Sequence, residues 1–151
     1  LRVRRVPCTL PGSDMPGPYS AALSGPDGPF APGCAGDPLA ALEGAPWQVT
    51  QLLGQAAPRA SDDTAAFTLQ IDSGRLSGRT SCNRYLGRVR VDLAKLAVRD
   101  LGATRLSCPV NLTNLETRFL DALEASTAFV RLPGGQIALY AGSTSVLVAK
   151  R

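Results

Sequence analysis

The chain contains no histidine, and this absence removes the side chain most often used as a general base or metal ligand. Its four cysteines stand at positions 8, 34, 82 and 108, so none forms a C-x-x-C pair. A structural zinc site needs closely spaced ligand pairs, and a thioredoxin-like dithiol needs C-x-x-C. A cysteine nucleophile normally relies on a histidine base. We therefore expect no catalytic residues, no metal site and no cofactor.

Long apolar runs, lysines and aromatic residues are also scarce. No stretch approaches the roughly 20 apolar residues that span a bilayer. Only Lys95 and Lys150 among the 16 basic residues are lysines, and aromatic residues make up 5% of the chain. Nucleic-acid-binding surfaces usually combine basic residues with several stacking aromatics. The formal charge of +4 is therefore not interpreted as a nucleic-acid-binding signal.

One group of arginines nevertheless lies close together in the sequence. Its members are Arg75, Arg79, Arg84, Arg88 and Arg90. Their near-alternate spacing would put several on one face of a strand. We interpret this group as a solvated face, with peripheral association to a membrane surface or another polyanion as the alternative.

The even number of cysteines, in a chain with 15 glycines and 12 prolines, is typical of an oxidising compartment. Four cysteines allow three pairings. We expect Cys8–Cys34 and Cys82–Cys108, each closing a loop of about 26 residues and stabilising the fold by about 3–4 kcal/mol. Reduced core thiols and redox-active thiols are the alternatives. Because the chain begins with Leu1, we expect a removed signal peptide or omitted upstream sequence, and an exported protein.

Residues 1–41 form a segment that differs in composition from the rest of the chain. Nine of the 12 prolines fall within the first 46 residues, and proline interrupts helices. The pattern predicts an irregular Pro/Gly-rich arm with a strand over 19–24, a turn over 25–28 and a connector over 37–42. We expect residues 42–151 to form the main domain.

Alternation of apolar and polar residues predicts most of the strands of this main domain. They are expected over 47–52, 66–71, 75–79, 87–91, 95–98, 128–132, 136–140 and 145–149. An apolar stripe at three- and four-residue steps predicts one helix over about 110–125. Thr113 and Glu116 have the spacing of a capping box. Short strands with one helix indicate a mainly β, α+β fold, in which a curled antiparallel sheet or partial barrel packs against that helix.

Four ordered blocks of this domain resemble the META domain family, the family of the heat-shock protein HslJ. The first is Leu42–Trp47, and the second is the Gly-x-x-x-Cys-Asn-x-Tyr-x-Gly stretch over 78–87, which contains Cys82, Asn83 and Gly87. The third runs from Thr104 to Cys108, and the fourth is the helix with Glu116. The family usually has glycine before the first of these cysteines, where this chain has Ser81; a positive φ there would strain the serine or require a rearranged turn.

The resemblance implies a bacterial envelope domain linked to heat and antibiotic stress, without an established catalytic activity. The family pattern singles out as site residues Trp47, Cys82, Asn83, Gly87, Thr104, Cys108 and Glu116. Residues 1–41 also resemble the C-terminal end of a different, uncharacterised envelope domain. That resemblance implies that the arm is the remnant of a preceding domain, stapled by Cys8 and Cys34.

Each chemical interpretation of these residues has a structural alternative that we favour. Asn83 and Gly87 are expected to serve turns, Trp47 to anchor the core, and Glu116 to cap its helix. The adjacent acids at 62 and 63 are interpreted as an exposed turn, since calcium requires six or more oxygen ligands.

The sequence leaves several functions open. We expect a non-enzymatic, monomeric envelope or periplasmic protein that binds or stabilises an unknown protein or hydrophobic ligand. A carrier for a lipid or hydrophobic segment would instead have a continuous cavity lined by Phe67, Leu69, Phe119 and Tyr140. A thiol enzyme would need Cys82 and Cys108 in reduced form. Binding of the arginines to anionic lipid or nucleic acid is a fourth hypothesis.

Overall fold

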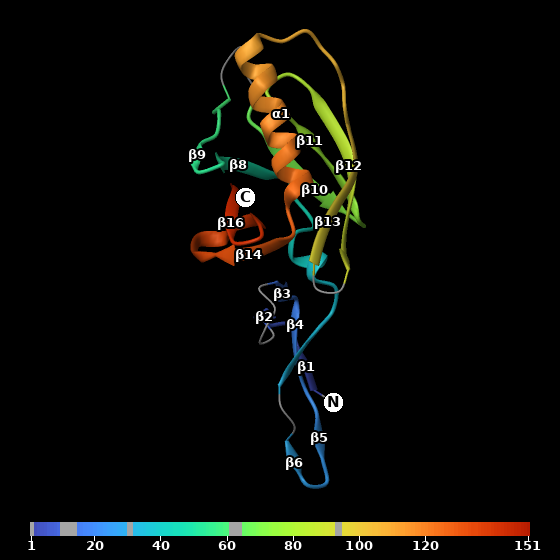
Figure 1. The fold of residues 1–151 in the computed structure, drawn as a ribbon. Coiled ribbons are helices and arrows are strands. Elements are labelled where there is room, and N and C mark those ends of the chain that lie inside the picture. Colours follow the sequence, from blue (N-terminus) through green and yellow to red (C-terminus); the bar gives the residue numbers. More distant parts are fainter. Residues whose placement is uncertain (1, 10–14, 30–31, 61–64, 93–94) are drawn as a thin grey trace.

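A computed structural model describes residues 2–9, 15–29, 32–60, 65–92 and 95–151. Figure 1 shows a main body of strands around one helix, from which the N-terminal arm extends as a narrow tail. The acidic pair at 62 and 63 lies outside the described residues. Within the part of the chain that is described, no helix is long and apolar enough to cross a membrane.

The main body is built on a nine-stranded sheet whose strand pairs are all antiparallel. Its path is β13-β12-β11-β10-β8-β16-β15-β14, and β9 pairs with β8 beside that path. The strands are β8 (Trp47–Leu52), β9 (Gln55–Ala56), β10 (Thr68–Asp72), β11 (Arg75–Arg79), β12 (Arg84–Asp92), β13 (Lys95–Ala103), β14 (Ala128–Leu132), β15 (Gln136–Ala141) and β16 (Thr144–Lys150). The short 3₁₀ turn η2 (Pro133–Gly135) joins β14 to β15.

The edge strands β13 and β14 approach each other without pairing into a ladder. A backbone hydrogen bond of 2.7 Å from Leu96 N to Thr127 O connects this region. The sheet is therefore curled but is not a closed barrel. This confirms the predicted mainly β architecture.

The single α-helix, α1 (Val110–Ala125), lies against the curled sheet and confirms the predicted range. It packs on β13 on one side and on β15 and β16 on the other. Phe119 is fully buried, and its ring centroid lies 4.8 Å from that of Phe67 and 5.5 Å from that of Tyr85. The space between helix and sheet is thus filled by aromatic rings. Burial raises the pKa of the Tyr85 hydroxyl, which donates to Thr68 O at 2.8 Å.

The predicted capping box of this helix is wrong. The helix begins at Val110 with Pro109 at its N-cap, so Thr113 and Glu116 lie within its first two turns. The Thr113 hydroxyl donates to Pro109 O at 3.3 Å, one turn back along the helix. Glu116 faces inward and is buried, with 7% of its surface exposed. Its partners belong to a different part of the chain.

The arm consists of short strands, as its prolines and glycines predict. A three-stranded sheet joins β1 (Arg2–Arg4), β4 (Tyr19–Ala22) and β7 (Gly33–Ala35), and two-stranded pieces join β2 (Cys8–Thr9) to β3 (Pro16–Gly17) and β5 (Ser24–Gly25) to β6 (Gly28–Pro29). The Cys8–Cys34 disulfide ties β2 to β7. Val3, Val6 and Leu23 are each more than half exposed, so this part of the arm has little core of its own.

The base of the arm packs onto the main body. Met15 and Leu39 are buried there, each with 4% of its surface exposed. Leu39 belongs to the 3₁₀ turn η1 (Pro38–Ala41), which begins with a hydrogen bond of 2.9 Å from Leu39 N to the Asp37 carboxylate. The predicted connector over 37–42 is therefore an ordered turn that leads into β8.

Arg151 fastens the segment that follows this turn. Its guanidinium lies 3.9 Å from the centre of the Trp47 ring and donates hydrogen bonds to the carbonyls of Leu42, Glu43 and Ala45. Trp47 Nε1 also donates to Leu42 O at 2.8 Å. Trp47 is 1% exposed, so its predicted role as a core anchor is consistent with its position.

We expect Arg151→Ala to lower the free energy of unfolding by about 1–2 kcal/mol, because three carbonyl contacts and a cation–π contact are lost. Arg151→Lys should lower the free energy of unfolding by less than Arg151→Ala, since lysine keeps the charge but lacks the forked donors of arginine. Urea unfolding monitored by Trp47 fluorescence measures both changes. Lys150→Ala, at an exposed neighbouring position, is the control; an equal loss in the control would contradict the expectation.

Candidate functional site

The fold brings most of the family-motif residues to one place beside the N-terminal half of α1. The turn between β11 and β12 supplies Cys82 and Asn83, and the segment between β13 and α1 supplies Thr104 and Cys108. Glu116 reaches the same place from the helix. A disulfide joins Cys82 to Cys108, with 6.5 Å between their Cα atoms. We refer to these five residues, together with Thr80, as the motif cluster.

Asn83 lies at the centre of the motif cluster and is 6% exposed. Its side-chain amide donates to both Glu116 carboxylate oxygens, at 3.0 and 3.1 Å, and contacts Cys108 Sγ at 3.6 Å. Its side-chain oxygen accepts from the Thr104 hydroxyl at 2.7 Å and from Leu106 N at 2.9 Å. One side chain therefore joins the β11–β12 turn, the segment before α1, and α1 itself.

Glu116 is a buried carboxylate whose partners are neutral donors. Besides the Asn83 amide, the hydroxyl of the fully buried Thr80 lies 2.7 Å from Glu116 Oε2. That hydroxyl also accepts from Asn83 N at 2.9 Å, which fixes the turn. Among the described residues, the salt bridge is Arg88–Asp100, so Glu116 has no basic partner there. The carboxylate is held in place by hydrogen bonds alone.

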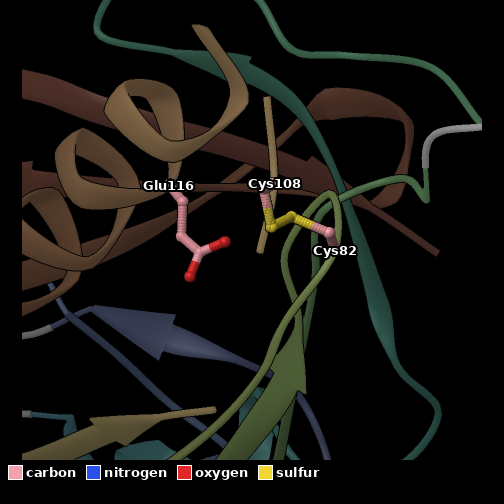
Figure 2. A group of neighbouring side chains, drawn as sticks. All are labelled: Cys82, Cys108 and Glu116. Atoms are coloured by element: carbon pink, nitrogen blue, oxygen red, sulfur yellow. A yellow bond between two sulfur atoms is a disulfide. The ribbon is translucent and has the colours of Figure 1, made fainter. Parts of the chain in front are cut away.

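Figure 2 shows the Cys82–Cys108 disulfide beside the Glu116 side chain. The two sulfur atoms and a Glu116 oxygen all lie within 4.8 Å of one another, a spacing that could hold a metal ion. The sulfurs are bonded to each other, however, so neither is a thiolate that could act as a ligand. A single remaining carboxylate is too few ligands for a structural metal site. The arrangement is suited to cross-linking and not to metal binding.

The chemical capacity of the motif cluster is correspondingly small. The side-chain groups of Thr80, Asn83 and Glu116 are all engaged with one another or with the neighbouring backbone. Ser81 Oγ is the buried side-chain oxygen without a hydrogen-bond partner in the described structure. Ser81 is absent from the non-glycine residues with positive φ, so replacing the family's glycine does not force it into the left-handed region.

Two of the family-motif residues lie away from this cluster. Trp47 is at the start of β8, in contact with Arg151. Gly87 is within β12, where the register with β13 shifts between Leu86 and Arg88. The predicted turn role of Gly87 is therefore wrong. A Cβ atom at Gly87 would lie 2.5 Å from Leu101 Cδ2, so the glycine allows a close approach between strands.

Sequence reasoning missed two members of this network. Thr80 stands three residues before Asn83. At this spacing a threonine hydroxyl can accept a hydrogen bond from the backbone N–H of the later residue. That local pattern could have identified Thr80. Leu106 contributes only its backbone N–H, which no side-chain pattern could have revealed.

The curled sheet, the single helix and the disulfide-tied turn define a small mainly β domain in which the motif residues form a structural tie. A model of the META domain matches residues 40–151, and the chain belongs to the META domain family. The family assignment confirms that part of the sequence interpretation. A search of the curated proteins finds no match.

Two solved structures share this fold. A protein from Burkholderia xenovorans, determined by NMR, is 25% identical with a TM-score of 0.60, over 85% of this chain and 97% of that one. Because the family match begins at residue 40, this alignment also includes part of the arm. A second protein determined by NMR is 20% identical with a TM-score of 0.52, over 70% of this chain and 86% of that one, and shows the fold alone.

Proposed function

We propose that this chain is a non-enzymatic, HslJ-like envelope protein that supports stress or antibiotic tolerance by binding or stabilising another component. The supporting observation is that the motif cluster uses its polar side chains for internal hydrogen bonds. An enzyme of the thiol class would need Cys82 or Cys108 as a free thiolate, whereas the two are joined in a disulfide.

The two disulfides support an exported location. Disulfides persist in oxidising compartments and are rare where thiols are kept reduced. All four cysteines are paired, as Cys8–Cys34 and Cys82–Cys108, which are the pairs expected from the sequence. We place the protein in the periplasm or at the cell envelope, where it acts as a monomer.

The interior gives less support to the carrier hypothesis. Phe67 and Phe119 are fully buried and Leu69 is 1% exposed. Phe67 and Phe119 pack ring against ring in the place where a lipid tail would have to lie. A binding function is therefore better assigned to the outer surface of the domain.

The tolerance function can be tested by deleting the gene in its own host and measuring survival after heat and antibiotic exposure. We expect lower survival, restored by the wild-type chain. Survival unchanged by the deletion would overturn the proposed role in stress tolerance.

The non-enzymatic part of the proposal is tested by complementing the deletion strain with Glu116→Gln. The new glutamine amide faces the Asn83 side-chain amide, so one hydrogen bond is lost and we expect less folded protein. If Glu116 has only a structural role, survival should be restored in proportion to the amount of folded variant in the periplasmic fraction. Glu124→Gln, at an exposed position of α1, is the matched control. A Glu116→Gln chain that is folded at wild-type levels but fails to restore survival would assign chemistry to this carboxylate and contradict the proposal.

A further inference from the structure

The outer face of β10–β13 carries a set of arginines that play no part in the motif cluster. Along β12, side chains alternate between buried Tyr85 and Val89 and exposed Arg84, Arg88 and Arg90. We call this exposed side of the four strands the basic face. These positions confirm that the near-alternate spacing places the arginines on one exposed face of the strand.

Strand pairing arranges five arginines of the basic face into two rows, and Arg90 lies outside them, opposite Ala97 on β13. In the first row, Arg88 is paired with Arg75 on β11 and with Arg99 on β13. In the second row, Arg84 is paired with Arg79. Neighbouring strands lie about 4.8 Å apart, so the first row spans about 10 Å. The rows are four residues apart along β12, which separates them by about 13 Å.

Acidic side chains balance only a small part of this charge. Asp72 and Asp100 are the acids among the described side chains of these four strands. Asp100 lies 3.9 Å from Arg88, and both side chains are at least three-quarters exposed. A pair of this kind is weak in water because solvent screens it. The basic face thus retains a net positive charge and free guanidinium donors.

The second row borders a hollow whose lining is polar at Thr68, Gln70 and Ser77 and apolar at Pro46 and Leu86. The hollow has a volume of about 860 Å³. Beside Arg79 and Arg84, its lining includes Thr68, Ser77 and Gly102. A second hollow of about 580 Å³ contains the first-row arginines Arg75 and Arg88, and the two hollows share Leu86 and Asp100. Each row of arginines therefore borders a hollow of its own, and the two hollows are neighbours on the basic face.

We propose that the basic face binds an extended acidic polysaccharide chain, with its carboxylates held by the two arginine rows. Arginine binds carboxylate oxygens through paired N–H donors, and two rows with a fixed separation suit a chain that carries charges at intervals. Thr68, Gln70 and Ser77, which line the hollow beside the second row, can exchange hydrogen bonds with sugar hydroxyls.

Other polyanions fit this surface less well. Tyr85 is the aromatic residue of these four strands, and its ring is buried, so the basic face offers no exposed ring on which a nucleobase could stack. A bilayer surface is flat, whereas the basic face is recessed, and Leu86 is its large exposed apolar residue. Both the shape and the side chains favour a narrow, hydroxyl-rich chain.

This inference deepens the proposed function by naming the binding partner, and it is tested independently of survival. Binding of the purified, oxidised chain to oligogalacturonate, a carboxylated glycan, is measured by isothermal titration calorimetry at low salt. Uncharged dextran, single-stranded DNA and phosphatidylglycerol vesicles are measured in parallel. We expect binding to oligogalacturonate that weakens as salt is raised, with weaker binding to the other three.

Two variants separate recognition by the basic face from general charge attraction. Arg88→Ala/Arg99→Ala removes two first-row charges, and we expect the affinity to fall about tenfold or more. Arg59→Ala/Arg118→Ala removes the same charge from exposed positions outside the basic face. This control should change the affinity for oligogalacturonate less than threefold. Gly102→Leu places a large side chain in the hollow. A Cβ atom at this position would have no other atom within 4 Å, so the leucine should block binding without unfolding the chain.

Several outcomes would overturn the assignment. Equal losses in the two arginine pairs would show that net charge alone drives binding. Wild-type affinity in Gly102→Leu would remove the hollow from the site. Tighter binding to DNA or to vesicles would assign the basic face to nucleic acid or membrane. An absence of oligogalacturonate binding would reject the polysaccharide while leaving the survival phenotype to be judged separately.

Discussion

Replacing Asn83 with alanine is expected to lower the free energy of unfolding by about 3 kcal/mol, because a buried network loses its central member. The variant leaves the Glu116 carboxylate without its amide donor while the helix keeps it buried. It also removes the acceptor that Thr104 and Leu106 use. Urea unfolding monitored by Trp47 fluorescence, with far-UV circular dichroism as a second probe, measures the change.

Asn114→Ala is the control for this prediction, since Asn114 is an exposed asparagine on α1, the helix that carries Glu116. It should change the free energy of unfolding by less than about 0.5 kcal/mol. A similar effect in both variants would contradict the central role of Asn83. Asn83→Asp keeps the shape of the side chain but replaces the amide donor with a second carboxylate beside Glu116. Repulsion between the two carboxylates should make this variant at least as unstable as Asn83→Ala at neutral pH.

Removal of the Cys82–Cys108 disulfide is expected to lower the free energy of unfolding by about 3–4 kcal/mol, since the bridge joins residues 26 positions apart. Cys82→Ala/Cys108→Ala is the variant, and Trp47 fluorescence reports on the main body because Trp47 is the single tryptophan. Thr80, Asn83 and Glu116 would still hold the two loops together. We therefore expect a folded protein that unfolds at a lower urea concentration.

The other disulfide provides the comparison for this experiment. Cys8→Ala/Cys34→Ala removes a bridge of the same sequence separation from the arm. The Trp47 transition should then shift by less than about 1 kcal/mol. Of the two described large apolar residues buried at the base of the arm, Met15 and Leu39, only Met15 lies within the loop that this bridge closes. Equal shifts for the two double variants would show that arm and main body unfold as one unit.

Much of the fold could be predicted because its strands have one buried and one exposed side. Trp47–Leu52, Arg75–Arg79 and Ala128–Leu132 are strands with the predicted bounds. The helix bounds were equally accessible, since one apolar stripe defines both its length and its buried side. Strand order was harder, because the pairing of β8 with β16 joins segments almost 100 residues apart.

The candidate site was predicted as a set of residues but not as an arrangement. Thr113 and Glu116 satisfy the spacing of a capping box, although the helix predicted over about 110–125 already includes both residues. Local sequence could not show that Glu116 turns inward toward the β11–β12 turn. Arg99 joins the basic face only through the register between β12 and β13, which includes a bulge. Both features depend on tertiary contacts, which a pattern of neighbouring residues does not contain.

The position of β16 inside the sheet limits the order in which the domain can form. β16 lies between β8 and β15. The strands from β13 to β8 and the pair β15–β14 therefore stay separate until residues 144–150 have left the ribosome. At a synthesis rate of about 5–20 residues per second, residues 53–143 take about 5–18 s to follow. During that time the emerging chain cannot close its sheet. Until β16 has emerged, β8 and β15 therefore each leave an edge without its final partner, and such edges are open to pairing with other chains.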